Sequence, residues 1–241
     1  MWEQSPVQTV YVYSKTTAVM IPKIIHYCWF GPRPFPEKAK LCIDSWKKYL
    51  PDYEVMFWNE DNAPINHPFA KAAIKANKYA FVADYVRTWA LYNYGGIYMD
   101  TDMLIIRKLD TLLSNQVFFA YEEPDRGYIN VAIWGAEKHG SFVKEVLDFY
   151  DSHPFDVSNV FACTIPRIVT EVYNNYSQPQ EIALLNYDSF YPFPGTKRRQ
   201  SNYLDYATPN TYGIHLWDFS WLTTKERIIE HIRMLIRWLK K

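Results

Sequence analysis

Asp100 and Asp102 are the residues of this sequence whose type and spacing most clearly indicate chemistry. They follow the run Gly95-Gly96-Ile97-Tyr98-Met99, in which two glycines break a helical pattern and a short apolar strand begins. Side chains at i and i+2 of an extended strand point to the same side, so both carboxylates are expected to face one ligand. Mg²⁺ and Mn²⁺ are held by one or two such carboxylates, with water and substrate phosphates completing the shell. The motif therefore predicts a divalent cation and a phosphate-bearing substrate.

A second charged pair precedes this motif. Residues 79–93 predict a helix, because apolar side chains recur there at spacings of three and four: Phe81, Val82, Tyr85, Val86 and Trp89. Asp84 and Arg87 lie off that stripe and three residues apart, so they are neighbours on one helical face. An acid beside a guanidinium can accept from and donate to neighbouring sugar hydroxyls. The alternative is a solvated ion pair of little energetic weight.

The string from Ala83 to Asp102 resembles the sugar-binding, DXD-containing region of glycosyltransferase family 32, and more distantly the glucosylating domain of large clostridial toxins. Residues 21–31 and 215–221 agree with that resemblance. It implies an α/β chain with a GT-A type nucleotide-diphospho-sugar transferase fold, in which helices flank a Rossmann-like mixed sheet. It also implies that Asp84, Arg87, Asp100 and Asp102 form the catalytic centre.

The end of the first strand is expected to hold the donor nucleotide. In open α/β sheets, ligands bind beyond the carboxyl ends of the strands. Tyr27 and Trp29 lie at such an end, and the resemblance implies that an aromatic ring there stacks on the base. Packing in the core is the alternative for Trp29. His26 lies inside the same strand, where a lone histidine is more often a hydrogen-bonded core residue than a ligand.

Residues 213–221 combine an imidazole, a carboxylate, a hydroxyl and large aromatic rings. The resemblance implies that this segment closes over the diphosphate and supplies the remaining metal ligand. His215 suits Mn²⁺ and Asp218 is the harder oxygen donor, so the sequence leaves the choice between them open. Ser220 is a weaker ligand that is better placed to bond phosphate, and Trp221 is expected to help hold the nucleotide. Acceptor-side groups are expected at Glu122, Glu123 and Asn130.

These features together predict a metal-dependent, retaining glycosyltransferase of the hexosyl type. It would use Mn²⁺ or Mg²⁺ to move a sugar from a UDP- or GDP-sugar to a glycan or lipid-linked glycan acceptor, in capsular or other surface polysaccharide synthesis. Two alternatives are a non-catalytic carbohydrate-binding protein and a D-x-D phosphatase. The phosphatase fits poorly, because its D-x-D closes the first strand of the domain, whereas here it comes much later.

Composition narrows the class of protein. The 241 residues suit one α/β domain, here 20–241, with 49% hydrophobic residues for its core. A net charge of zero argues against a nucleic-acid partner, which normally meets a basic surface. The 18% of aromatic residues suit stacking on sugars and bases. Three unevenly spaced cysteines indicate neither a disulfide framework nor a zinc site, so a reducing cytoplasm is the expected location.

The two ends of the chain carry separate predictions. Residues 1–19 precede Met20 and are interpreted as a possible N-terminal extension. Residues 226–241 predict an amphipathic helix with a basic face. Packing on its own domain is the usual role of such a helix, and contact with anionic lipid at the inner face of the cell membrane is the alternative.

The remaining pattern predicts the elements that position these residues. Strands are expected at 21–29, 53–58, 116–122 and 128–135, the last two as a hairpin around residues 124–127. Helices are expected at 37–50 and 68–77, before the one at 79–93. Strands and helices alternate as an α/β domain requires.

Overall fold

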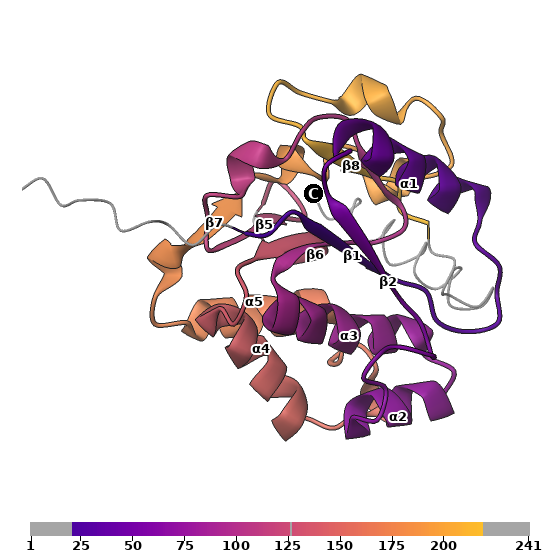
Figure 1. The fold of residues 1–241 in the computed structure, drawn as a ribbon, viewed down its shortest axis with the longest axis vertical. Coiled ribbons are helices and arrows are strands. Elements are labelled where there is room, and N and C mark those ends of the chain that lie inside the picture. The colour runs from indigo at the N-terminus through magenta and orange to yellow at the C-terminus, as the bar shows by residue number, and fades with distance from the viewer. Residues whose placement is uncertain (1–20, 126, 219–241) are drawn as a thin grey trace, which may run out of the picture.

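The computed structural model describes residues 21–125 and 127–218, which fold around a six-stranded mixed sheet (Figure 1). Its strand order is β2-β1-β3-β6-β5-β7. β1 runs parallel to β2 and β3, β6 runs antiparallel to β3 and β5, and β7 is parallel to β5. The strands are β1 (Ile24–Cys28), β2 (Glu54–Trp58), β3 (Gly96–Met99), β5 (Val117–Tyr121), β6 (Ile129–Ala136) and β7 (Ile182–Leu185).

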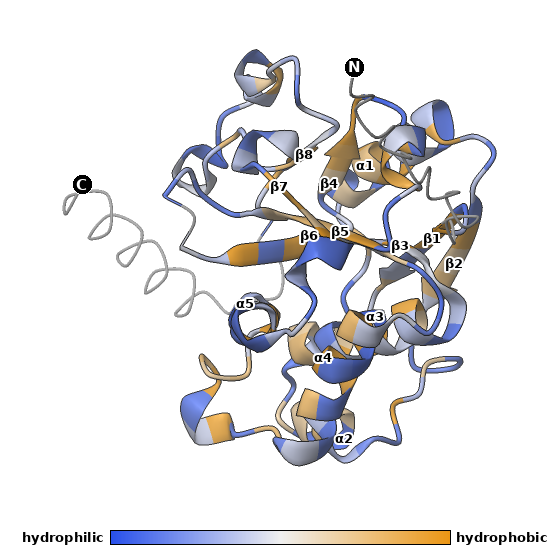
Figure 2. Ribbon diagram, turned by 90° about the vertical axis from the view of Figure 1, so that its left-hand side faces the viewer, coloured by the Kyte–Doolittle hydropathy of each residue, from blue (hydrophilic) through white to orange (hydrophobic). Residues whose placement is uncertain are grey.

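Four helices lie on one side of this sheet, and the first of them packs mainly on the second rather than on the strands (Figure 1). All eight residues of β6 are buried, as expected for a central strand with both faces covered. Figure 2 shows mostly apolar strands beside helices whose colouring alternates between polar and apolar. The four helices are α2 (Pro68–Lys75), α3 (Tyr79–Tyr94), α4 (Ser141–Ser152) and α5 (Ile165–Asn175).

The opposite face carries helix α1 (Glu37–Tyr49) and a second, two-stranded sheet (Figure 1). Its strands β4 (Met103–Ile105) and β8 (Gly213–His215) are antiparallel, and Met103 pairs with His215. Trp46 of α1 donates a 2.7 Å hydrogen bond to the Met103 carbonyl. Ser45 Oγ accepts one of 2.9 Å from Ile105 N–H. Helix α1 therefore holds the strand that follows the D-x-D motif.

The paired glycines end α3 and allow β3 to begin. Gly95 and Gly96 have φ angles of 68° and 107°, which glycine adopts without strain. A Cβ atom on Gly96 would lie 2.6 Å from the Ile24 carbonyl oxygen. Glycine thus permits both the helix end and the close approach of β3 to β1.

The helices and strands expected from the sequence are confirmed to within a few residues at their ends. The predicted hairpin is also confirmed, because β5 and β6 pair antiparallel on either side of residues 124–127. The first strand begins at Ile24, since Ile21 N–H bonds the Leu113 carbonyl rather than a neighbouring strand. β4, β7, β8, α4 and α5 were not expected.

The proposed extension at 1–19 and the basic helix at 226–241 lie outside the residues that the structure describes. Within 21–125 and 127–218, no helix has the length and apolar character needed to cross a bilayer.

Candidate metal and sugar-nucleotide site

The D-x-D motif forms a tight turn between the two sheets rather than the end of an extended strand. β3 stops at Met99, and Met103 N–H donates a 2.9 Å hydrogen bond back to the Asp100 carbonyl. Asp100 N–H is held by the Ala132 carbonyl of β6 at 2.7 Å. The expectation of extended backbone was wrong, because the chain reverses here to leave the six-stranded sheet for β4. The turn nevertheless brings both carboxylates to one place.

Three side chains meet at this turn and fit a divalent cation. Asp100, Asp102 and His215 each offer one ligand atom, all within 4.8 Å of one another. His215 Nε2 lies 3.1 Å from Asp102 Oδ1. Two ligand atoms at right angles, each about 2.1 Å from an ion, lie about 3 Å apart, so this spacing suits neighbouring positions of an octahedral shell. Two carboxylates and an imidazole form a donor set that Mn²⁺ accepts readily.

Asp102 also forms hydrogen bonds with the segment that follows β8. Its Oδ2 accepts a 2.6 Å hydrogen bond from Asp218 N–H, and its carbonyl accepts one of 2.9 Å from Leu216 N–H. Asp218 therefore meets Asp102 through its backbone, and its carboxylate is outside the three-residue cluster found among the described residues. Of the two ligand candidates, the structure brings His215 to the D-x-D motif.

The charges of this cluster are set by burial and by each other. Burial would raise the pKa of Asp102, but the nearby charge and hydrogen bond of His215 and the Asp218 N–H hold that pKa below its usual range. Burial lowers the pKa of His215, but the Asp102 carboxylate raises this pKa by more. The pKa of His215 is therefore raised above its usual value. Asp102 is thus kept as an ionised oxygen ligand.

Asp84 and Arg87 form a buried pair that reaches the D-x-D motif. Arg87 Nη2 lies 2.8 Å from Asp84 Oδ1 and 3.1 Å from Asp100 Oδ1, while Nη1 donates to the Val131 carbonyl at 2.8 Å. The Arg87 and Asp84 side chains are only 6% and 9% exposed. The solvated-pair alternative is therefore wrong, because α3 is packed on almost every side. Tyr98 stacks beneath the guanidinium and donates to Asp100 Oδ1 at 3.0 Å.

Burial works against the negative charge of both acids in this network, Asp84 and Asp100. Burial raises the pKa of Asp84 to about 7, against the opposing charge of Arg87. Its carboxylate also accepts a hydrogen bond from the backbone N–H of Ile165, the first residue of α5. Burial likewise raises the pKa of Asp100, opposed by Arg87. Arg87 therefore stabilises two desolvated acids at once.

The aromatic residues at the end of β1, Tyr27 and Trp29, pack against different rings. Tyr27 is packed against Phe57, with ring centroids 4.9 Å apart. Trp29 stacks on Phe35 at 4.7 Å, and its Nε1 donates to the Arg33 carbonyl. Both rings are half-buried at the carboxyl end of the strand, where a nucleotide was expected.

His26 is a core residue. Its Nε2 lies 2.8 Å from the Gly95 carbonyl, and its Nδ1 accepts from Trp58 Nε1 at 3.2 Å. The expectation for a lone histidine within a strand is thus confirmed. Ser220 and Trp221 lie outside the described residues, so their expected roles remain predictions.

Sequence reasoning missed three residues that contribute to this site. The carbonyls of Val131 and Ala132 hold Arg87 and Asp100, but a carbonyl carries no sequence signal. Tyr191 donates to the Asn130 carbonyl at 3.0 Å and places its ring edge-on to His215. The expected acceptor-side residue Asn130 donates to Glu122 at 3.1 Å, close to this centre.

Comparison with known proteins agrees with this architecture. Residues 36–119 match the family model described as "Glycosyltransferase sugar-binding region containing DXD motif". The structure superimposes on the "PaToxG Glycosyltransferase" with a TM-score of 0.53 and 20% identity, covering 66% of this chain and 71% of that one.

Relatives by sequence carry consistent names. Inositol phosphoceramide mannosyltransferase 3 of Schizosaccharomyces pombe is 33% identical over 145 residues, which are 56% of this chain and 38% of that protein. Mannosyl phosphorylinositol ceramide synthase SUR1 of Saccharomyces cerevisiae is 28% identical over 170 residues, 66% of this chain and 43% of that protein. The chain thus spans well under half the length of these two relatives. An "Uncharacterized glycosyltransferase" of Acanthamoeba polyphaga mimivirus, L373, is 26% identical over 84% of both chains.

The fold is that of GT-A type glycosyltransferases, as the sequence predicted. Within that class, the resemblance to glycosyltransferase family 32 is confirmed: this chain carries the DXD-containing sugar-binding region, and its relatives are named as glycosyltransferases.

Proposed function

We propose that this chain is a metal-dependent, retaining glycosyltransferase that moves a hexosyl group from a UDP- or GDP-sugar to a hydroxyl of a glycan or lipid-linked glycan. The observation that carries the proposal is the meeting of Asp100, Asp102 and His215 beside the buried Asp84–Arg87 pair. One site then holds ligands for a cation and groups that match sugar hydroxyls. The names of the relatives favour mannose as the sugar and an inositol phospholipid as the acceptor.

The chemistry follows from these groups. A divalent cation bound by the two aspartates and His215 would act as a Lewis acid toward the leaving diphosphate. Arg87 holds Asp100 in place through a buried ion pair, and Tyr98 donates to the same carboxylate oxygen. Asp84 offers a carboxylate beside the guanidinium, which suits two adjacent hydroxyls of the donor sugar. Breaking the bond between the anomeric carbon and the diphosphate leaves the electron pair on the diphosphate. The acceptor hydroxyl oxygen bonds that carbon on the same face, and its proton passes to the departing diphosphate.

The proposal predicts metal-dependent turnover of sugar nucleotides. Incubated with GDP-mannose, UDP-glucose or UDP-galactose, the protein is expected to release nucleoside diphosphate with Mn²⁺ and to stop when the metal is chelated. Liquid chromatography of the nucleotides measures this release. A protein that binds a sugar nucleotide but releases no diphosphate, with or without an added glycan acceptor, would instead be a carbohydrate-binding protein.

A second prediction separates recognition of the sugar from recognition of the nucleotide. Asp84→Asn is expected to weaken binding of the intact sugar nucleotide at least tenfold more than binding of the free nucleoside diphosphate, because only the former carries the hexose. Calorimetry with both ligands in Mn²⁺ gives the two affinities. Glu37→Gln, an exposed acid on α1, is the matched control and should change neither. Equal losses for the two ligands would assign Asp84 to the fold alone, through Arg87 and Ile165.

A role in capsular or other surface glycan synthesis is part of this proposal, and so is action in the cytoplasm. Membrane contact through residues 226–241 stays a prediction on a segment beyond the described residues.

A further inference from the structure

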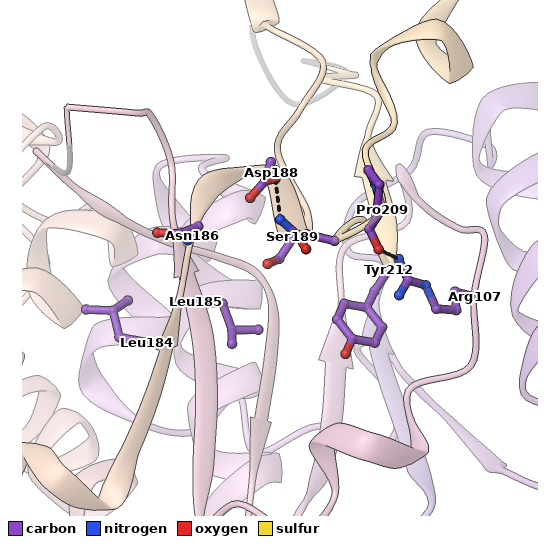
Figure 3. A pocket seen from close by; sticks show the side chains of 9 residues that line it. Arg107, Leu184, Leu185, Asn186, Asp188, Ser189, Pro209 and Tyr212 are labelled. Carbon is purple, nitrogen blue, oxygen red and sulfur yellow. Dashed lines mark hydrogen bonds between the residues drawn. The ribbon is translucent and has the colours of Figure 1, made fainter.

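A cavity of about 370 Å³ lies at the end of β7, and the residues that line it include neither aspartate of the D-x-D motif (Figure 3). Small-molecule sites usually fall in the range of about 300–1,000 Å³. In Figure 3, Leu184, Leu185 and Asn186 form one side, Tyr212 and Arg107 form the other, and Asp188 lies between them. We propose that this cavity is a second carbohydrate-binding site, which takes a neutral sugar unit of a glycan chain.

Arg107 gives the site a fixed set of donors. Its Nη2 donates to the carbonyls of Pro209 and Thr211, at 2.6 and 2.7 Å. The guanidinium lies over the Tyr212 ring, 4.6 Å from its centroid. These contacts fix the plane of the group, while Nη1 and Nε have no hydrogen-bond partner in the part of the chain that the structure describes. Two donor groups are thus held in place for a ligand.

Asp188 gives a matching acceptor. Its Oδ2 accepts hydrogen bonds from Thr208 Oγ1 at 2.9 Å and from Asn210 Nδ2 at 3.1 Å. Its Oδ1 accepts none from the described residues, so one carboxylate oxygen is oriented but available. The carboxylate is part of the cavity wall and disfavours an anion such as phosphate by charge repulsion.

The chemistry of these walls selects the ligand class. Neighbouring hydroxyls of a sugar each donate and accept, so they can bond a guanidinium and a carboxylate together. Leu185 and Pro209 line the cavity and provide apolar surface for the C–H face of a sugar ring. A few fixed polar groups on a partly apolar wall are typical of small-molecule sites.

The cavity is linked to the metal centre by two adjacent segments. Tyr212 N–H bonds the Ser189 carbonyl at 2.9 Å, and His215 N–H bonds the Phe190 carbonyl at 3.0 Å. The segments 189–190 and 212–215 therefore line the cavity at one end and position His215 at the other. The inference goes beyond the proposed transfer reaction, since it assigns a separate binding site, and it is tested without donor or metal.

The test is a saturation-transfer NMR titration with mannobiose, lactose and maltose, in the absence of metal and nucleotide. At least one disaccharide is expected to bind saturably. Asp188→Asn should weaken that binding at least tenfold, because it replaces the cavity-facing oxygen by a donor while a carbonyl oxygen remains for Thr208 and Asn210. Asp151→Asn, an exposed acid on α4, is the charge-matched control and should bind as the wild type does.

A second variant separates loss of sugar binding from loss of folding. Arg107→Lys keeps the charge but loses the planar donors, so it should also weaken binding at least tenfold, and thermal unfolding checks that both variants are folded. Adding Mn²⁺ with GDP should leave the disaccharide affinity unchanged. The proposal is overturned if no disaccharide binds, if folded variants bind normally, if Mn²⁺ with GDP displaces the sugar, or if inorganic phosphate competes in an Arg107-dependent manner.

Discussion

Replacing Asp102 by asparagine is expected to lower turnover by more than about a hundredfold, because the proposed cation loses an ionised ligand where charge develops on the leaving group. The same change should loosen the segment after β8, since Asp102 Oδ1 and Oδ2 contact His215 and Asp218. Steady-state kinetics in Mn²⁺ measures the first effect. Hydrogen exchange at the amides of Leu216 and Asp218 measures the second.

The control for this variant is Asp110→Asn, which removes an exposed carboxylate that is paired with Lys23 and is not part of the three-residue cluster. It should leave turnover and exchange close to those of the wild type. Near-normal turnover of Asp102→Asn in Mn²⁺ would contradict the metal assignment. Faster exchange with normal turnover would mean that Asp102 serves the fold but not the reaction.

Replacing Arg87 by methionine is expected to destabilise the protein by about 3–5 kcal/mol, the usual effect of removing one partner of a buried ion pair. The loss should be at the upper end of that range, because both Asp84 and Asp100 would be left without their counter-charge. Denaturant unfolding measures the change. Turnover should also fall, since Asp100 loses the group that orients it.

Arg107→Met is the matched control, because this arginine is more exposed and, among the described residues, meets backbone carbonyls and a tyrosine ring rather than a carboxylate. Its free energy of unfolding should fall much less than that of Arg87→Met. An Arg87→Met protein as stable as the wild type would show that the buried pair contributes no net stability here. Full turnover by that variant would remove Arg87 from the proposed site.

Apart from β4, the sequence predicted the elements before residue 136 well, because their signals are local. Helix 79–93 follows from apolar spacing, and its end follows from the paired glycines. The two strands of the smaller sheet were missed for physical reasons. β4 and β8 are only three residues long, so neither can display a periodic pattern, and they exist because Met103 pairs with a distant His215.

The site was predicted in its residue types but not in its geometry. Asp100, Asp102 and His215 were named as possible ligands, and the structure brings them together. The burial of Asp84 and Arg87 was not foreseen, because their positions off the apolar stripe suggest a solvated face. Tertiary packing overrides that pattern, since α2, α4 and β6 pack on α3 and cover sides that a lone helix would expose.

The pairing of β4 with β8 has a consequence for how the protein is made. Met103 emerges from the ribosome long before His215, and the family-model match at 36–119 ends before β8 begins. Contacts between residues so far apart in sequence form late, because the intervening chain must first be ordered. A nascent chain therefore carries both aspartates of the D-x-D motif well before it can complete the three-residue cluster. The ability to hold the proposed cation is thus acquired only after β8 has been made, when most of the sheet is already available as a scaffold.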